Sequence, residues 1–187
     1  NTGTGYYQGY AGSGDGFISK FESFDRTWYS FFGGSGIDGA YGVTVDNFSN
    51  VYITGTTGSS ISSLTCSAPT SGEFVNCITS SNFYTQVFGG AHDSYIAGFD
   101  ASNSLFWSTY IGGNSAGNEN EEGNSIVAGV NKIYLCGESG SYGSTPYPTQ
   151  IRGDFYNQSH TSSSPASNPN IDIVVTVVDL SELVSIS

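Results

Sequence analysis

An internal repeat limits the folds open to this 187-residue chain more than any other feature of its sequence. Three segments begin with an aspartate and continue with alternating or continuous apolar residues: 15–22 (DGFISKFE), 93–100 (DSYIAGFD) and 172–179 (DIVVTVVD). Their starts are 78 and 79 residues apart. The chain therefore consists of similar units, and its fold must be one that similar units can build together.

Three further elements recur in the same order after the first two of these segments. They are 28–34 with 107–113, 41–46 with 124–129, and 51–55 with 133–137. Each unit thus contains four short runs of strand character, separated by turn-forming residues such as 33–36 (GGSG) and 46–50 (DNFSN). Four consecutive strands with short links predict one small antiparallel sheet per unit.

Apolar residues lie on both faces of the predicted strands, as Phe17, Ile18 and Phe21 illustrate. Successive side chains of a strand point to opposite faces, so such a sheet needs a neighbour on each side. Repeated four-stranded sheets that stack face to face build a β-propeller. We expect an all-β fold, an incomplete β-propeller-type array with about two full blades and a partial blade at each end.

The repeat also predicts the domain organisation. We expect residues 1–14 to hold the last strand of a preceding blade, because YYQG at 6–9 resembles YITG at 52–55. Residues 15–92 form a blade with a long loop at 58–92, residues 93–171 a blade with a long loop at 138–171, and residues 172–187 the first strand of a following blade. Closed propellers need at least about four blades, so further blades or a protein partner should cover the open faces.

The acidic composition narrows the choice of partners. The chain has 16 acidic and 4 basic residues and a net charge of −12, which argues against nucleic acid or an anionic membrane as partner. No apolar run approaches the ~20 residues of a membrane helix. The chain as given lacks the pattern of a signal peptide, and we expect it to be a mature or excised piece of a longer protein.

Cys66 and Cys77 lie in one loop-like segment, and two interpretations stay open. A disulfide would close a short loop and stabilise the fold by about 3 kcal/mol in the chain-entropy model, whereas two free cysteines are an equally simple alternative. Cys136 lies inside the apolar run IYLCG, where we expect it to be a small buried hydrophobic residue.

The composite pattern resembles the SBBP repeat, a bacterial β-propeller repeat common in large secreted proteins. It reads W-x-x-x-x-G-G, then G-V-T-V-D, then S-N-V-Y-I-T-G, then D-x-F/Y-I-x-x-F-D, and the match is close over 15–57 and 93–140. The second unit departs from it at Gly129 and over 118–122. The resemblance implies an exported bacterial protein, extracellular or on the cell surface, often using type IX secretion and often adhesin-like, with no established catalytic set.

The candidate metal ligands in this sequence are acidic residues. Hard oxygen ligands suit calcium, and the calcium set would be Asp38, Glu119, Glu121 and Glu122. The alternative is a solvated, charged turn, and we expect no other cofactor. The aspartates that open the repeated strands, Asp15 among them, are expected to accept backbone N–H bonds from the preceding turn.

Aromatic residues divide into two groups. Trp28 and Trp107 occupy equivalent positions, and we expect them to pack between sheets. Aromatic residues for contact with a surface glycan or protein would lie in the long loops, at Tyr142, Tyr147, Phe155 and Tyr156. His92 beside an aspartate does not amount to a catalytic triad without the geometry that defines one.

We therefore expect a non-enzymatic, secreted or cell-surface module that is structural or adhesive, or that binds a ligand through its variable loops. One alternative is a cargo or passenger segment of a bacterial secretion or surface-assembly machine. A second alternative is a hydrolase on a propeller scaffold, which would need acidic side chains that converge in a pocket.

Overall fold

The computed structural model describes residues 4–60, 65–69, 72–79, 88–113, 120–140 and 172–180. These ranges contain nine strands and no helix. The strands are β1 (Gly16–Glu22), β2 (Asp25–Phe32), β3 (Asp38–Val45), β4 (Val51–Thr57), β5 (Asp93–Phe99), β6 (Leu105–Ile111), β7 (Glu121–Gly129), β8 (Lys132–Ser139) and β9 (Asp172–Asp179). Within these ranges the chain has no helix that could span a membrane.

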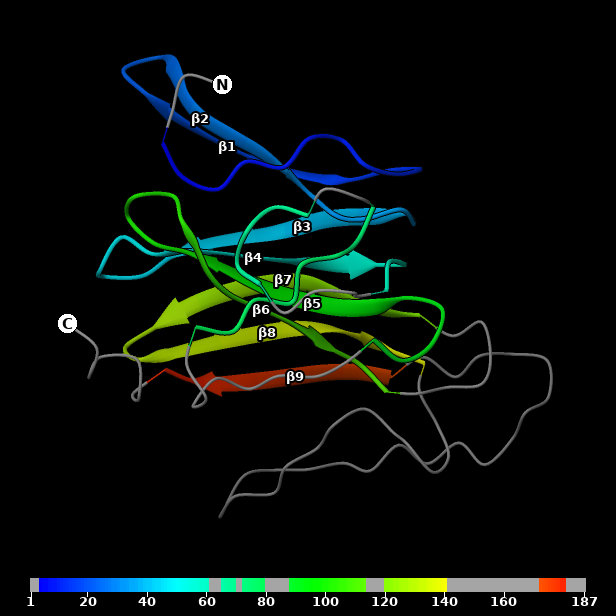
Figure 1. Ribbon diagram of the computed structural model, residues 1–187. Coiled ribbons are helices and arrows are strands. Elements are labelled where there is room, and N and C mark those ends of the chain that lie inside the picture. Colours follow the sequence, from blue (N-terminus) through cyan, green and yellow to red (C-terminus); the bar gives the residue numbers. More distant parts are fainter. Residues whose placement is uncertain are drawn as a thin grey trace.

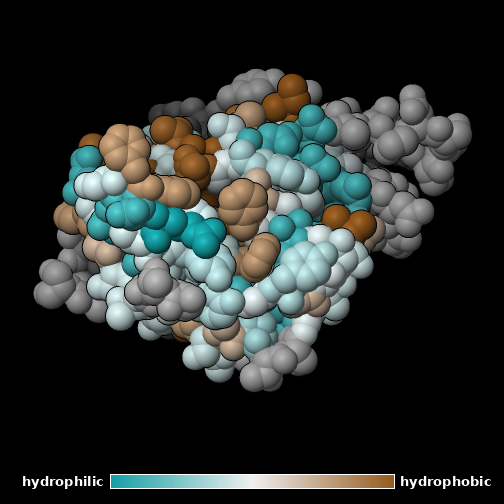
Figure 2. Space-filling view, turned by 90° about the horizontal axis from the view of Figure 1, so that it is seen from above, coloured by the Kyte–Doolittle hydropathy of each residue, from teal (hydrophilic) through white to brown (hydrophobic). Residues whose placement is uncertain are grey.

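The strands form three antiparallel sheets, which confirms the all-β class and the incomplete propeller. Sheet 1 contains β1 and β2, sheet 2 contains β3, β4, β5 and β6 in that order, and sheet 3 contains β7, β8 and β9. In Figure 1, β1 and β2 lie at the top and β8 and β9 at the bottom. Figure 2 looks from above onto the outward side of sheet 1, where tan and brown apolar side chains lie among teal hydrophilic ones.

The strands pair differently from the prediction of one sheet per repeat unit. The last strand of the first unit, β4, pairs along its whole length with the first strand of the second unit, β5. Sheet 2 therefore contains strands of both units. The predicted domain boundary at residue 93 separates two repeats in the sequence, but the strands on its two sides, β4 and β5, belong to one sheet. Likewise β9 pairs with β8 from Ser139 opposite Asp172 to Lys132 opposite Asp179, so it completes sheet 3 and does not begin a separate blade.

The link between β2 and β3 explains this grouping. Instead of turning back as a hairpin, residues 33–37 cross from sheet 1 to sheet 2, where Gly58 N donates to Ile37 O. Gly34 and Gly36 permit the crossing, because a Cβ on Gly34 would lie 2.6 Å from Ser59 Cβ and one on Gly36 would lie 2.5 Å from Gly58 O. The connection from β4 to β5 is long, so β5 can return alongside β4 and pair with it.

The expectation of a strand within residues 1–14 is wrong for the described residues 4–14, which contain no strand. They form two backbone hydrogen bonds to strand residues, from Phe31 N of β2 to Gln8 O at 3.2 Å and from Asp38 N of β3 to Gly14 O at 2.6 Å, and their other bonds go to side chains and turns. Trp28 Nε1 donates to Tyr6 O at 2.8 Å and Gln8 N donates to Ser30 Oγ at 2.9 Å. Tyr6 N also donates to the carbonyl of Asn103 in the β5–β6 turn. The segment thus lies across the junction of sheets 1 and 2.

Two apolar cores separate the three sheets. The first core lies between sheets 1 and 2 and includes Trp28, Phe32 and Phe99. Its rings meet at an edge-to-face angle, with Trp28 and Phe99 centroids 5.5 Å apart. The second core lies between sheets 2 and 3 and includes Trp107 and Leu135. The predicted role of the two tryptophans is therefore confirmed.

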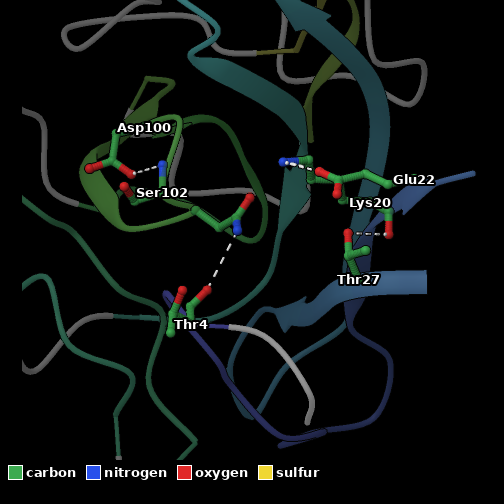
Figure 3. Close-up of polar contacts among 7 residues, drawn as sticks. Thr4, Lys20, Glu22, Thr27, Asp100 and Ser102 are labelled. Carbon is green, nitrogen blue, oxygen red and sulfur yellow. Dashed lines mark hydrogen bonds and ion pairs between the residues drawn. The ribbon is translucent and has the colours of Figure 1, made fainter. Parts of the chain in front are cut away.

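Two of the hairpin turns use the same aspartate device. Asp46 Oδ1 accepts the backbone N–H groups of Phe48 and Asn50, and Asp100 Oδ1 accepts those of Ser102 and Ser104. Figure 3 shows the contact between Asp100 and Ser102, with Thr4 of the N-terminal segment close to the same turn. Between β7 and β8 a glycine replaces the aspartate, and the turn shortens to residues 130–131.

The β1–β2 turn yields a stability prediction. Ser23 and Phe24 both have positive φ, 49° and 74°, although neither is glycine. Phe24 is fully exposed, so no packing offsets this unfavourable backbone conformation. Phe24→Gly should raise the free energy of unfolding by about 1 kcal/mol, measured by chemical denaturation. The matched control is Phe48→Gly, because Phe48 is also an exposed turn residue but does not have a positive φ. This change should not stabilise the protein.

Candidate functional site

The junctions between sheets bring acidic side chains together in two equivalent pairs. Short parallel bridges join Gly14 to Ile37 at the first junction and His92 to Asn120 at the second. The residue that follows each bridge partner is acidic, which gives the pairs Asp15 with Asp38 and Asp93 with Glu121. This pairing recurs with the repeat, although the two members of a pair belong to different sheets.

In the first pair, both carboxylates accept hydrogen bonds from the chain around them. Asp15 Oδ2 accepts Ala11 N at 2.7 Å, and Asp38 Oδ2 accepts Gly34 N at 2.7 Å. Asp38 also accepts the hydroxyls of Thr57 and Ser59. Burial raises the pKa of Asp15, the Ala11 hydrogen bond opposes this rise, and the charge of Asp38 adds to it.

Glycine is required beside this pair. A Cβ on Gly33 would lie 2.8 Å from Asp38 Oδ2 and 3.0 Å from Asp15 Oδ1. Both carboxylates therefore lie against the backbone of the sheet crossing at the place where a side chain of residue 33 would start, and a larger residue at this position would collide with them. Each unit has a Gly-Gly pair at the end of its second strand. This steric conflict explains why the first residue of the pair is glycine.

The second pair is more deeply buried. Asp93 and Glu121 are both inaccessible to solvent, and Asp93 Oδ2 accepts Gly89 N at 2.8 Å. Burial raises the pKa of Asp93 to about 8, opposed by the Gly89 hydrogen bond and reinforced by the charge of Glu121 and a hydrogen bond to it. A proton shared between the two carboxyl groups accounts for this contact.

The predicted role of the strand-opening aspartates is confirmed at Asp15 and Asp93, which accept N–H groups four residues earlier in the chain. The structure does not bring together the described members of the calcium set. Asp38 begins β3, whereas Glu121 begins β7, and each lies near a hydroxyl directly across its own sheet, at Thr57 and Ser139. Across the described ranges, no three acidic, histidine or cysteine side chains gather as metal ligands.

Several predicted contact residues fall outside the described ranges and stay predictions. They are the calcium candidate Glu119 and the loop aromatics Tyr142, Tyr147, Phe155 and Tyr156. Glu122 is half-buried in β7, where its charge helps to raise the pKa of Tyr41, after the larger effect of burial. The half-buried His92 lies with its Nδ1 2.9 Å from Asn120 Oδ1.

Cys66 and Cys77 form a disulfide, which decides between the two alternatives left open by the sequence. The segment that it anchors covers the free edge of β6. Ser108 N donates to Cys77 O at 2.9 Å, and Cys77 N donates to Ser108 Oγ at 2.8 Å. Ile78 bridges Trp107 one residue along. The disulfide therefore fixes a segment that satisfies an edge which would otherwise be open to other strands.

The outward sides of the two outer sheets are apolar and exposed. We name the outward side of sheet 1 the head face; it carries Phe17, Phe21, Tyr29 and Phe31, with Tyr7 and Tyr10 against it. We name the outward side of sheet 3 the tail face; it carries Val127, Tyr134, Cys136, Ile173, Val175 and Val177. Among the strands that the structure describes, none covers either face.

The tail face corrects the prediction for Cys136, which is exposed. Cys136 lies opposite Val175 on β9, so it points to the uncovered side of sheet 3. The apolar run around it predicted burial correctly for Ile133 and Leu135, which point to the other side. Sequence alone does not tell which side of the sheet a neighbour covers.

The repeat identifies what the exposed faces correspond to inside the molecule. Phe17 and Phe21 on the head face are 69% and 63% exposed, whereas the equivalent residues of the second unit, Tyr95 and Phe99, are both 0% exposed. Val175 on the tail face is 68% exposed, and its equivalent Ile96 is 0% exposed. The same sequence positions are thus buried wherever a neighbouring sheet is present.

Comparison with known families identifies one match within the chain. Residues 30–61 match the family model of the SBBP beta-propeller repeat. The matched stretch begins inside β2 and continues beyond β4, so it includes the crossing from sheet 1 to sheet 2. No protein with a curated description matches the chain.

The buried acidic pair predicts a pH dependence of stability. Because the folded state raises the pKa of Asp93 to about 8, it binds the proton more tightly than the unfolded chain does. The stabilising effect is complete below the ordinary pKa of about 4 and is lost as the pH rises through about 8. The free energy of unfolding should therefore fall over this range. Asp93→Asn should flatten that fall and make the variant more stable than the wild type at pH 9.

Denaturant unfolding at a series of pH values measures this effect. Asp25→Asn, at an exposed position in the β1–β2 hairpin, is the matched control and should leave the pH profile unchanged. An Asp93→Asn profile with the slope of the wild type would show that this carboxyl group does not retain its proton in the folded state.

The disulfide yields a second stability prediction. Replacing both Cys66 and Cys77 by serine should lower the free energy of unfolding by about 3 kcal/mol, because the unfolded chain loses a loop constraint. It should also speed hydrogen exchange at Ser108 N, which donates to Cys77 O. Cys136→Ser keeps the disulfide and is the control; unchanged exchange at Ser108 in the double variant would contradict a tethering role for the disulfide.

Proposed function

Because the chain carries an SBBP-type beta-propeller repeat, we propose that it acts as a non-enzymatic scaffold and binding module. Its head and tail faces bind further sheets, and its variable loops contact a ligand or a surface glycan. The observation that carries this proposal is the pair of exposed apolar faces, whose repeat equivalents are buried between sheets. Exposed apolar patches of this kind are typical of sites where another molecule packs.

The positions of the carboxylates favour a scaffold function over the alternative of a hydrolase. Asp15, Asp38 and Asp93 each accept backbone N–H groups at a sheet junction, and Glu121 is buried beside Asp93. Glycoside hydrolysis needs two carboxyl groups on either side of a bond that a substrate can reach. Fully buried groups such as Asp93 and Glu121 instead join adjacent sheets. A turnover of polysaccharide or peptide that is lost in Glu121→Gln would contradict the non-enzymatic role.

We further propose that this is an exported bacterial protein, located outside the cytoplasm in the extracellular space or on the cell surface. The disulfide supports this location, because disulfides persist mainly in oxidising compartments. The net charge of −12 suits a soluble exported surface. The presence of the disulfide in protein isolated from its natural source, blocked with an alkylating reagent at lysis, would support the location; free thiols at both positions would contradict it.

The faces can be tested separately from the fold. Lysine at Val175 should change the free energy of unfolding by no more than about 0.5 kcal/mol, because the side chain is exposed. The same change should reduce the fluorescence of a dye that binds apolar surfaces. Lysine at the equivalent buried residue, Ile96, should cost several kcal/mol, because it places an unpaired charge in the second core.

These two variants form a matched pair, since they change corresponding positions of successive repeat units. Equal destabilisation by Val175→Lys and Ile96→Lys would show that the tail face is already covered and is not available to a partner. Dye binding that is unchanged in Val175→Lys would also count against the tail face as the exposed apolar surface.

A further inference from the structure

We propose that the turn rim of this protein docks on the surface of a neutral, zwitterionic lipid bilayer. We define the turn rim as the four hairpin turns that join described strands at one end: residues 23–24, 46–50, 100–104 and 130–131. The proposal concerns strand ends, whereas the proposed scaffold function concerns the outward sides of the sheets, so it goes beyond that function. The tips of turns can enter the surface of a bilayer without any segment that spans it.

These turns lie on one side of the stack. Strands β1, β3, β5 and β7 begin at the sheet junctions, where Asp38 N donates to Gly14 O and Glu121 N donates to His92 O. The hairpin turns follow the opposite ends of these strands, and Figure 1 shows them along the left of the stack. A further sheet would pack on the head face or the tail face. Its own turns would then extend the turn rim without covering it.

Three of these turns present a large apolar side chain to solvent. Phe24 is fully exposed in the β1–β2 turn, and Phe48 and Val130 are exposed in the β3–β4 and β7–β8 turns. Phe48 and Val130 occupy equivalent repeat positions, because each lies three residues before one of the equivalent segments 51–55 and 133–137. An exposed apolar tip therefore recurs with the repeat.

The backbone of Phe24 indicates that its exposure has a function. Its φ of 74° lies in the left-handed region, which is unfavourable for a bulky side chain, and Ser23 before it also has a positive φ. Glycine or asparagine meets this backbone requirement at lower cost. Strain of this kind is typical of functional positions. Contact of the phenylalanine ring with lipid would compensate for the strain in the bound state.

The separation of the tips favours a bilayer over a protein partner. Each tip is a single apolar residue among small or polar ones, as Phe48 is between Asn47 and Ser49. A protein interface buries a continuous apolar centre inside a polar rim, which single residues on different turns do not provide. Lipid molecules rearrange around each side chain, so separate tips can enter one bilayer surface. Their contributions then combine, because all the tips belong to one molecule.

Charge favours a zwitterionic bilayer over an anionic one. Within the described ranges the lysine and arginine residues lie beside the turn rim: Lys20 and Arg26 flank the β1–β2 turn, and Lys132 follows the β7–β8 turn. Acidic residues lie among them, and Lys20 Nζ is 2.9 Å from Glu22 Oε1 (Figure 3). Zwitterionic headgroups offer both a phosphate and a cationic group to this mixture. An anionic bilayer would repel a chain of net charge −12.

The test is co-sedimentation of the full chain with vesicles of phosphatidylcholine, a zwitterionic lipid. The wild type should sediment with these vesicles, and less of it should sediment with vesicles that contain an anionic lipid. Phe24→Gly should weaken binding about tenfold, because burial of one phenylalanine side chain contributes roughly this factor. The same change is expected to stabilise the fold, so weaker binding would not result from unfolding. Phe48→Gly should weaken binding to a similar extent.

Phe17→Ser is the matched control, because Phe17 is also exposed but lies on the head face, at the other end of β1 from the turn. This variant should bind as the wild type does. Phe24→Trp adds a direct readout: its fluorescence should shift to shorter wavelengths when vesicles are added, whereas Trp28 and Trp107 are already buried.

Three results would overturn the proposal. The first is a wild type that stays in the supernatant with phosphatidylcholine vesicles or binds anionic vesicles more tightly. The second is Phe24→Gly that binds as the wild type does, and the third is an equal loss of binding in Phe17→Ser, which would assign the contact to the head face.

Discussion

Each sheet of this protein carries apolar side chains on both of its sides, and the rest of the structure depends on covering them. Sheet 2 is covered on both sides, by the first core around Phe99 and the second core around Trp107. Burial of apolar surface contributes roughly 25 cal/mol per Å², and it favours a stack of sheets over a single sheet in water. Turn chemistry and hydrogen bonding determine where the strands begin and end, but the double-sided apolar surface determines that the sheets must stack.

The acidic pairs at the junctions add a polar constraint to this stack. A carboxylate that accepts backbone N–H groups fixes the chain where it enters a strand, as Asp15 and Asp93 do. Its partner across the junction, Asp38 or Glu121, brings like charge close to it, and burial of both groups favours a shared proton at the second junction. Apolar packing tolerates small rotations between sheets, whereas the backbone hydrogen bonds that cross the junctions beside these pairs, from Asp38 N to Gly14 O and from Glu121 N to His92 O, require one relative position of their donors and acceptors.

Much of this architecture could be predicted from the sequence, because strands, turn aspartates and buried tryptophans depend on local spacing. The grouping of strands into sheets could not be predicted, because the side chains of β4 alternate in the same way whether β4 is a sheet edge or pairs with β5. That choice depends on the glycines at 34 and 36, which permit a crossing instead of a hairpin. The exposure of Cys136 and the pairing of Asp93 with Glu121 were missed for a related reason: both depend on contacts between units, which spacing within one unit does not reveal.

The pairing of β4 with β5 has a consequence for how such chains lose and gain units. Sheet 2 takes two strands from each of two repeats, so neither repeat forms a complete hydrogen-bonded sheet by itself. A cut between the repeats would leave unpaired strand edges on both sides and expose the first core. The sequence unit and the cooperative folding unit are therefore offset by half a period. This interlocking joins neighbouring repeats by backbone hydrogen bonds as well as by side-chain packing, and it makes a single repeat a poor unit for independent folding.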